Sequence, residues 1–149
     1  MLSNDDFKKV IELTPLIAID LIIKFENKFL LGKRINEPAK DYYFVPGGRI
    51  LKDEKINDAF NRLSKDELGI NINLEKLKFH KVAEHHYKKN YFNDDSSTHY
   101  ICLSYKYELN INEFNLLNLT KQHNDVLWLS KNDLLENYLV HQYTKNYFI

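Results

Sequence analysis

An α+β fold, with helices packed on a mixed β-sheet as an α/β/α sandwich, is predicted by three features of the sequence. Apolar runs of strand length occur along the chain. Between them lie segments whose apolar residues recur at helical spacing, and this mixture is typical of layered domains. The third feature is the length of 149 residues, which fits a single domain over residues 1–149 rather than two.

A short helix is expected near the N-terminus. Ser3 has the side chain of an N-cap, and Phe7 and Val10 follow at helical spacing until Pro15 ends the pattern. A pair of strands is expected next, followed by a short extended segment that the Pro-Gly-Gly turn at residues 46–48 interrupts. These three segments are Leu16–Ile23, Lys28–Arg34 and Tyr43–Val45.

The clearest helix is predicted after residue 55. Ile56, Ala59, Phe60 and Leu63 form one apolar face, and Gly69 is well placed as the C-terminal stop. The remainder is expected to alternate between strands, loops and short helices. Its segments are the strands Leu77–Tyr87, His99–Leu109 and Val126–Leu129, the polar loop Lys88–Thr98, the turn-like Asn110–Asn124, a helix capped by Ser130 through Asn137, and a helical tail His141–Ile149.

Composition and charge exclude several classes of function. Twenty-one basic residues balance 21 acidic ones, so no global field favours nucleic acid or an anionic membrane. The longest apolar stretch is interrupted by Asp20 and is too short to span a bilayer, and the acidic start MLSNDD is unlike a signal peptide. We therefore expect a cytoplasmic protein without a nucleic-acid or membrane partner. The single cysteine, Cys102, is expected to be a buried, inert thiol.

The segment of residues 47–70, GGRILKDEKINDAFNRLSKDELGI, carries the chemistry. Mg²⁺ takes hard oxygen ligands, usually one or two carboxylates plus substrate phosphate. Glu67, with Asp66 beside it, offers carboxylates in the last helical turn, and a carbonyl at Gly48 is a further oxygen donor because glycine allows close approach of the main chain. Taken alone, such a helix is more often a solvated face with i,i+4 ion pairs, here Asp58–Arg62 and Arg62–Asp66.

The same segment resembles the Nudix box, which is a glycine, five residues, a glutamate, seven residues, and then Arg-Glu-apolar-x-Glu-Glu-x-Gly-apolar. The matching positions are Gly48, Glu54, Arg62, Glu67, Gly69 and Ile70. Leu63 replaces the first glutamate after the arginine, Ser64 replaces an apolar residue, and Asp66 replaces the next glutamate. The resemblance implies a Nudix-type fold and Mg²⁺-dependent hydrolysis. The missing carboxylate at position 63 leaves a ligand set that suits one metal ion.

Most of the chain is similar to the GDP-mannose mannosyl hydrolase branch of that family, in which the same box glutamate is lost. The strings that carry the likeness are DDF, TPL, LLGKRINEPA, FVPGGR, THY, QH and WL, spread from residue 5 to residue 129. The resemblance implies that water attacks the anomeric carbon of a GDP-hexose, GDP-mannose first, with inversion and release of GDP and the free sugar. That chemistry parallels an inverting glycosidase, with Mg²⁺ and cationic side chains stabilising the leaving diphosphate.

The resemblance also implies roles for individual residues. One Mg²⁺ per subunit, replaceable by Mn²⁺, is expected on the Gly48 carbonyl, Glu67 and Gln122. The general base is expected to be His123, whose imidazole is largely neutral at pH 7. Asp20 would orient the site, and Arg34 completes the catalytic set. The expected substrate contacts are Leu2, Phe7, Arg34, Arg49, Arg62, His85 and Tyr100, and the family likeness implies a homodimer.

Two alternatives stay open at this stage. One is a conventional Nudix diphosphatase that attacks phosphorus in a nucleoside triphosphate or diphosphate derivative, for which Glu54 and Asp66 would supply further ligands. The other is a non-catalytic nucleotide-sugar binding module. A zinc site formed by His85, His86 and His99 is disfavoured, because strand alternation sends the first two to opposite faces and no cysteine pair assists.

Overall fold

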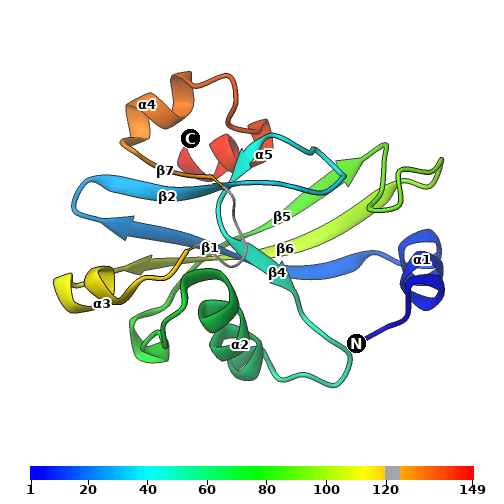
Figure 1. Cartoon of the computed structure of the whole chain (residues 1–149), viewed down its shortest axis with the longest axis horizontal. Coiled ribbons are helices and arrows are strands. Elements are labelled where there is room, and N and C mark those ends of the chain that lie inside the picture. The colour runs from blue at the N-terminus through cyan, green and yellow to red at the C-terminus, as the bar shows by residue number, and fades with distance from the viewer. Residues whose placement is uncertain (120–124) are drawn as a thin grey trace.

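A mixed seven-stranded sheet lies between two groups of helices in the computed structural model, which describes residues 1–119 and 125–149 (Figure 1). The main strand order is β3-β2-β1-β6-β5, with β4 paired to β1 and β7 to β2. The strands are β1 Leu16–Phe25, β2 Lys28–Lys33, β3 Tyr43–Phe44, β4 Gly47–Arg49, β5 Lys78–Tyr87, β6 Thr98–Glu108 and β7 Val126–Leu129. The helices are α1 Asn4–Leu13, α2 Ile56–Leu68, α3 Ile111–Leu116, α4 Lys131–Glu136 and α5 Gln142–Lys145, with 3-10 turns η1 Leu74–Lys76 and η2 Asn146–Phe148.

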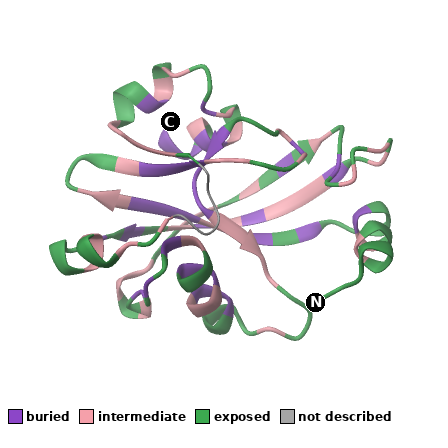
Figure 2. Cartoon of the chain, viewed as in Figure 1, coloured by how far each residue is buried: buried purple, intermediate pink, exposed green. Residues whose placement is uncertain are grey.

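Strand β1 is the centre of the fold. It pairs in parallel with β6 along one edge and antiparallel with β2 and β4 along the other, so both of its edges are hydrogen-bonded. On one face Ile19 and Leu21 pack against Phe60 of α2, and on the other Ile22 packs with Leu134 and Tyr147 from the C-terminal helices. Figure 2 shows buried residues gathered along β1 and β2 and on part of α2. The α/β/α layering predicted from the sequence is therefore confirmed.

The predicted helix ends are confirmed where local chemistry sets them. The Ser3 side chain accepts a hydrogen bond from the Asp6 amide at 3.2 Å and begins α1. Gly69 ends α2 with a positive φ of 72°, a conformation that costs glycine little. The helical prediction for the C-terminal tail also holds, since α5 and η2 occupy it.

Two predictions from the sequence were wrong. Residues 47–49 do not simply break a strand but form β4, where Gly47 pairs with Asp20. A Cβ on Gly47 would lie 2.2 Å from the Ile19 carbonyl oxygen, so only glycine lets this segment approach β1. Residues 111–116 form α3 instead of a turn, because Asn110 and Glu113 make a reciprocal capping box.

No helix among the described residues is long and apolar enough to cross a membrane.

Candidate active site

A cleft of about 250 Å³ opens on the face of the sheet opposite α2. It is lined by β1, β4, β5 and β6 and by the loop after β2. The strands bring the site together through their register. Ala18 pairs with Cys102, and Tyr100 pairs with His85, so their side chains share one face of the sheet. The site residues among its lining are Asp20, Arg34, Gly48, Arg49, His85, Tyr87, Tyr100 and Cys102.

The floor of the cleft holds a carboxylic acid with an unusual environment. Tyr147 donates a hydrogen bond to Asp20 Oδ2 at 2.5 Å, across 127 positions of the chain. Burial raises the pKa of Asp20 to about 6, although the hydrogen bond from Tyr147 and the positive charge of Arg34 both act in the opposite direction. Asp20 therefore titrates near the working pH of many enzymes, which is a property of functional carboxyls.

Asp20→Asn is expected to increase the free energy of unfolding by about 3 kcal/mol at pH 8, because two pKa units correspond to that energy. The folded-state pKa of about 6 lies above the ordinary pKa of 3.8 for an aspartate, so the native state binds the proton more tightly than the unfolded chain. Native stability should therefore fall as pH rises from about 4 to about 6 and level off above that. Urea unfolding at pH 4 and pH 8 measures this. Equal pH dependence in the wild type and the variant would contradict it.

His85 lies beside Asp20 and is held in one orientation. Its ring stacks on Tyr143 at a centroid distance of 4.4 Å and an interplanar angle of 2°. Burial lowers the pKa of His85 to about 4, with the charge of Arg34 acting in the same direction. The imidazole is therefore neutral at pH 7, and it can donate or accept a hydrogen bond in the cleft without adding charge.

Two arginines supply the positive charge of the cleft. The Arg34 guanidinium donates to the Pro38 carbonyl at 2.8 Å and stacks on Phe44, with Cζ 4.0 Å from the ring centroid. Arg49 stacks on Phe7 at 4.1 Å. Guanidinium groups that are oriented by stacking keep their remaining N–H donors available for planar contacts to phosphate oxygens.

Helix α1 reaches the cleft through aromatic contacts. Phe7 packs against Tyr91 and Phe92 at centroid distances of 6.0 and 5.9 Å, and Tyr91 lines the cleft. Lys8 forms an ion pair of 3.2 Å with Asp94 in the same loop. Phe7 is therefore adjacent to the cleft but not part of its lining. Leu2 is not in this cleft; it lies in a separate groove with Val10 and Ile50.

The structure does not bring Arg62 into the cleft. Its guanidinium donates to both carboxylate oxygens of Glu54, at 2.7 and 2.9 Å, and to the Arg49 carbonyl at 2.7 Å. The bond from Arg62 lowers the pKa of Glu54, which also accepts a bond from the Leu51 amide. Arg62 and Glu54 thus tie the loop after β4 to α2, and neither Arg62, expected to contact substrate, nor Glu54, a metal ligand only in the diphosphatase alternative, lines the cleft.

The face of α2 that the sequence predicts to bind a metal carries few carboxylates. Leu63 is buried in the core, and its Cδ2 would lie 2.5 Å from a Cβ on Gly48. Asp66 is half exposed and lies 3.9 Å from Arg62. The donors that remain, the partly buried carboxylate of Glu67 and the carbonyl of Gly48, are hard oxygen ligands of the kind that Mg²⁺ prefers, and they fit a single ion. Gly48 is one of the residues that line the cleft, whereas Glu67 is not.

The structure therefore gathers Asp20, Arg34, Arg49, His85 and Tyr100 as expected. Gln122 and His123 lie outside the described residues. Sequence reasoning missed Tyr147, because nothing local links residue 147 to residue 20. It also missed the place of Cys102, which is buried as predicted but lines the cleft. The signal that could have found Cys102 is strand alternation: residues two positions apart share one face of a sheet, so Cys102 lies on the same face as Tyr100.

The mixed sheet between helices, with a glycine-rich strand leading into a helix that carries acidic residues in its last turn, is the arrangement of a Nudix-type domain. The model of the NUDIX domain family matches residues 14–147, and the chain belongs to the Nudix hydrolase family.

Two curated relatives are similar in sequence. The low-salt glycan biosynthesis protein Agl8 of Haloferax volcanii is 33% identical over 108 residues, which cover 72% of this chain and 68% of that protein. The ADP-ribose pyrophosphatase of Methanocaldococcus jannaschii is 38% identical over 71 residues, covering 47% of this chain and 42% of that protein.

Solved structures share the fold. The MutT NUDIX hydrolase from Burkholderia pseudomallei has a TM-score of 0.70 at 20% identity, over 91% of this chain and 96% of that one. The NUDIX domain of Shewanella oneidensis NrtR, complexed with ADP ribose, has a TM-score of 0.61 at 15% identity, over 98% of this chain and 95% of that one. At these identities the likeness establishes the fold alone.

Proposed function

We propose that the chain hydrolyses a GDP-hexose, GDP-mannose first, by attack of water at the anomeric carbon with inversion, releasing GDP and the free sugar. The observation that carries the proposal is Leu63, an apolar residue packed in the core where the Nudix box has a carboxylate. With one carboxylate fewer, the face of α2 is poorly suited to activate water for attack on phosphorus. Departure of a diphosphate from carbon needs only neutralisation of its charge.

The cleft offers positively charged groups for the diphosphate and hydrogen-bonding groups for the sugar, which supports this chemistry. Arg34 and Arg49 offer guanidinium donors for the diphosphate, and Tyr100 lines the same cleft. Asp20 and the neutral His85 present hydrogen-bonding groups suited to sugar hydroxyls. The aromatic ring of Phe7, next to Arg49, is placed to pack on a base.

The general base of the proposal is His123, and Gln122 precedes it. An imidazole takes a proton from water on the face of the sugar opposite the diphosphate, as the inverting geometry requires. Mg²⁺, held by Glu67, the Gly48 carbonyl and Gln122, would supply positive charge to the leaving diphosphate.

Hydrolysis of GDP-mannose with Mg²⁺ in ¹⁸O-labelled water tests the proposal. We expect the label in free mannose and none in GDP, because the bond that forms is between water oxygen and carbon. Label in a phosphate with release of GMP would overturn the carbon mechanism and leave a conventional diphosphatase. GDP-mannose binding without hydrolysis would instead favour a binding module.

A conventional diphosphatase is the second candidate. It is favoured by the likeness to an ADP-ribose pyrophosphatase over 71 residues. ADP-ribose in the same labelled-water experiment separates the two. Its diphosphate is attached to C5 of the ribose and not to an anomeric carbon, so the carbon mechanism predicts no hydrolysis, whereas a diphosphatase predicts hydrolysis with label in a phosphate.

A further inference from the structure

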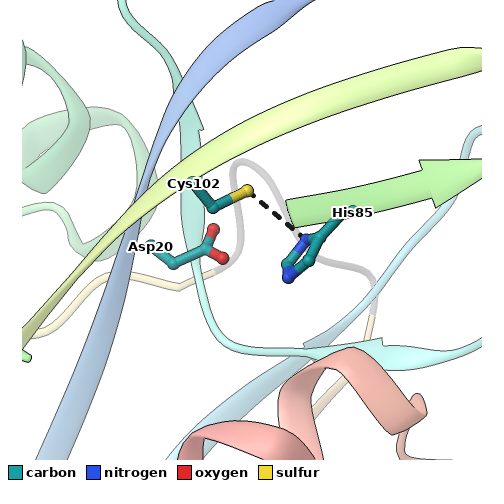
Figure 3. Close-up of side chains that lie close together, drawn as sticks. All are labelled: Asp20, His85 and Cys102. Carbon is teal, nitrogen blue, oxygen red and sulfur yellow. Dashed lines mark hydrogen bonds between the residues drawn. The ribbon is translucent and has the colours of Figure 1, made fainter. Parts of the chain in front are cut away.

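Three potential metal ligands converge on the floor of the cleft. Asp20, His85 and Cys102 come from β1, β5 and β6, and one ligand atom of each lies within 4.8 Å of the other two. Figure 3 shows the carboxylate, the imidazole and the thiol turned toward a common space, with Cys102 Sγ 3.3 Å from His85 Nδ1. Among the described residues this is the one group of three such side chains.

The groups around these side chains match the outer shell of a metal site. Metal-binding histidines usually use one ring nitrogen as the ligand and make a hydrogen bond through the other, which fixes the ring. Here His85 Nδ1 faces the thiol, while Nε2 lies 3.5 Å from the Tyr147 hydroxyl. That hydroxyl also holds Asp20, and Tyr143 stacks on the imidazole. Two of the three ligands are therefore already oriented.

We propose that Asp20, His85 and Cys102 bind a thiophilic divalent cation of the Zn²⁺ type, through a ligand set that shares no residue with the Gly48, Glu67 and Gln122 proposed for Mg²⁺. Sulfur, nitrogen and oxygen donors together select Zn²⁺ over Mg²⁺, which prefers an all-oxygen shell. Three protein ligands leave a fourth position, and all three line the cleft, so that position faces solvent or substrate.

Binding requires a small contraction and the loss of one proton. Ligands at zinc bond lengths of about 2.0–2.3 Å lie roughly 3.5 Å apart, so the widest separation in the group must shorten by about 1 Å. The S–H bond of Cys102 breaks as the metal–sulfur bond forms, and the proton passes to solvent. The bound cation occupies the floor beside Arg34 and displaces a sugar from Asp20. Displacement of the sugar would inhibit hydrolysis. Binding of the cation is independent of the proposed function, whereas the inhibition rests on that function.

Cobalt provides the direct test, because Co²⁺ substitutes for Zn²⁺ and absorbs in the near ultraviolet when a thiolate coordinates it. Titration of the full chain with Co²⁺, without nucleotide, should give this band with a 1:1 endpoint, and Zn²⁺ should remove it. Cys102→Ser should abolish the band. The matched control is His86→Ala, an exposed histidine that neighbours His85 on the other face, and its band should be unchanged.

Two further variants keep the test informative if Cys102→Ser does not fold. Asp20→Asn removes a direct ligand and Tyr147→Phe removes the shared hydroxyl; the latter should weaken Co²⁺ binding by about 10–100-fold. Absence of the band in the wild type would overturn the site, as would Zn²⁺ binding by calorimetry that persists unchanged in all three variants. Since the titration contains no nucleotide, its outcome does not depend on whether the chain hydrolyses GDP-mannose.

Discussion

His123→Ala is expected to lower kcat for GDP-mannose by about 10²–10⁴-fold, the usual scale for loss of a general base. The neutral imidazole that accepts the proton from water is lost, while the groups proposed to hold GDP remain. The affinity for GDP should therefore change little. In the sequence, His123 precedes Asp125 by two positions. The Asp125 carboxylate accepts a hydrogen bond from the Tyr43 hydroxyl at 2.5 Å. The Asp125 carbonyl accepts a hydrogen bond from the amide of Lys33, which precedes Arg34.

Steady-state kinetics with GDP-mannose and calorimetry with GDP and Mg²⁺ measure the two quantities separately. The matched control is His86→Ala, which removes an exposed imidazole on the other face of β5 and should retain activity. Turnover of the His123→Ala variant within a few-fold of the wild type would rule out His123 as the base. A large loss of GDP affinity would reassign it to binding.

Arg34→Met is expected to lower kcat by about 10²–10³-fold, the scale for removing one preorganised donor from a developing anion. The diphosphate gains negative charge as its bond to carbon breaks, so the guanidinium interacts more strongly with the transition state than with the substrate. The methionine retains much of the apolar stem but loses the charged guanidinium that stacks on Phe44. The positive charge of Arg34 also lowers the pKa of Asp20, so the variant should titrate Asp20 at higher pH.

The measurements are kcat and KM for GDP-mannose across pH 5 to 9, together with thermal unfolding. Lys40→Met is the matched control, because it removes an exposed cation from the same loop. An equal loss in both variants would mean a general electrostatic effect. A rise in KM with unchanged kcat for Arg34→Met would contradict a role in the transition state.

The substitution at position 63 connects stability to chemistry in this protein. Leu63 packs with Phe60 and Ile19 in the core under α2 and fills the space that Gly48 leaves. Position 63, where the Nudix box has a glutamate, thus contributes apolar packing to the core in place of a carboxylate. Meanwhile Arg62 and Glu54 still join the loop to the helix, so the loop and the helix of the box stay connected although one carboxylate is missing.

Local patterns in the sequence were enough to predict much of the fold. The apolar face of α2, the glycine that ends it and the cap at Ser3 depend on contacts within one or two turns, so they can be read from neighbouring residues. The box spacing likewise identified the loop and helix that carry Glu67. The strand at residues 47–49 was missed because its pairing with β1 joins segments about 30 positions apart, and α3 was missed because its capping box lies in an Asn-rich run.

The sequence by itself determined the class of the protein, through the periodicity of its helices and strands and the fixed spacing of the box. Only the tertiary structure decided which side chains meet in the cleft. It brought Tyr147 to Asp20 and Cys102 to His85, and it paired Arg62 with Glu54 instead of leaving it in the cleft. The physical reason is that strand register and the packing of the C-terminal tail are set by long-range burial, which no local spacing records.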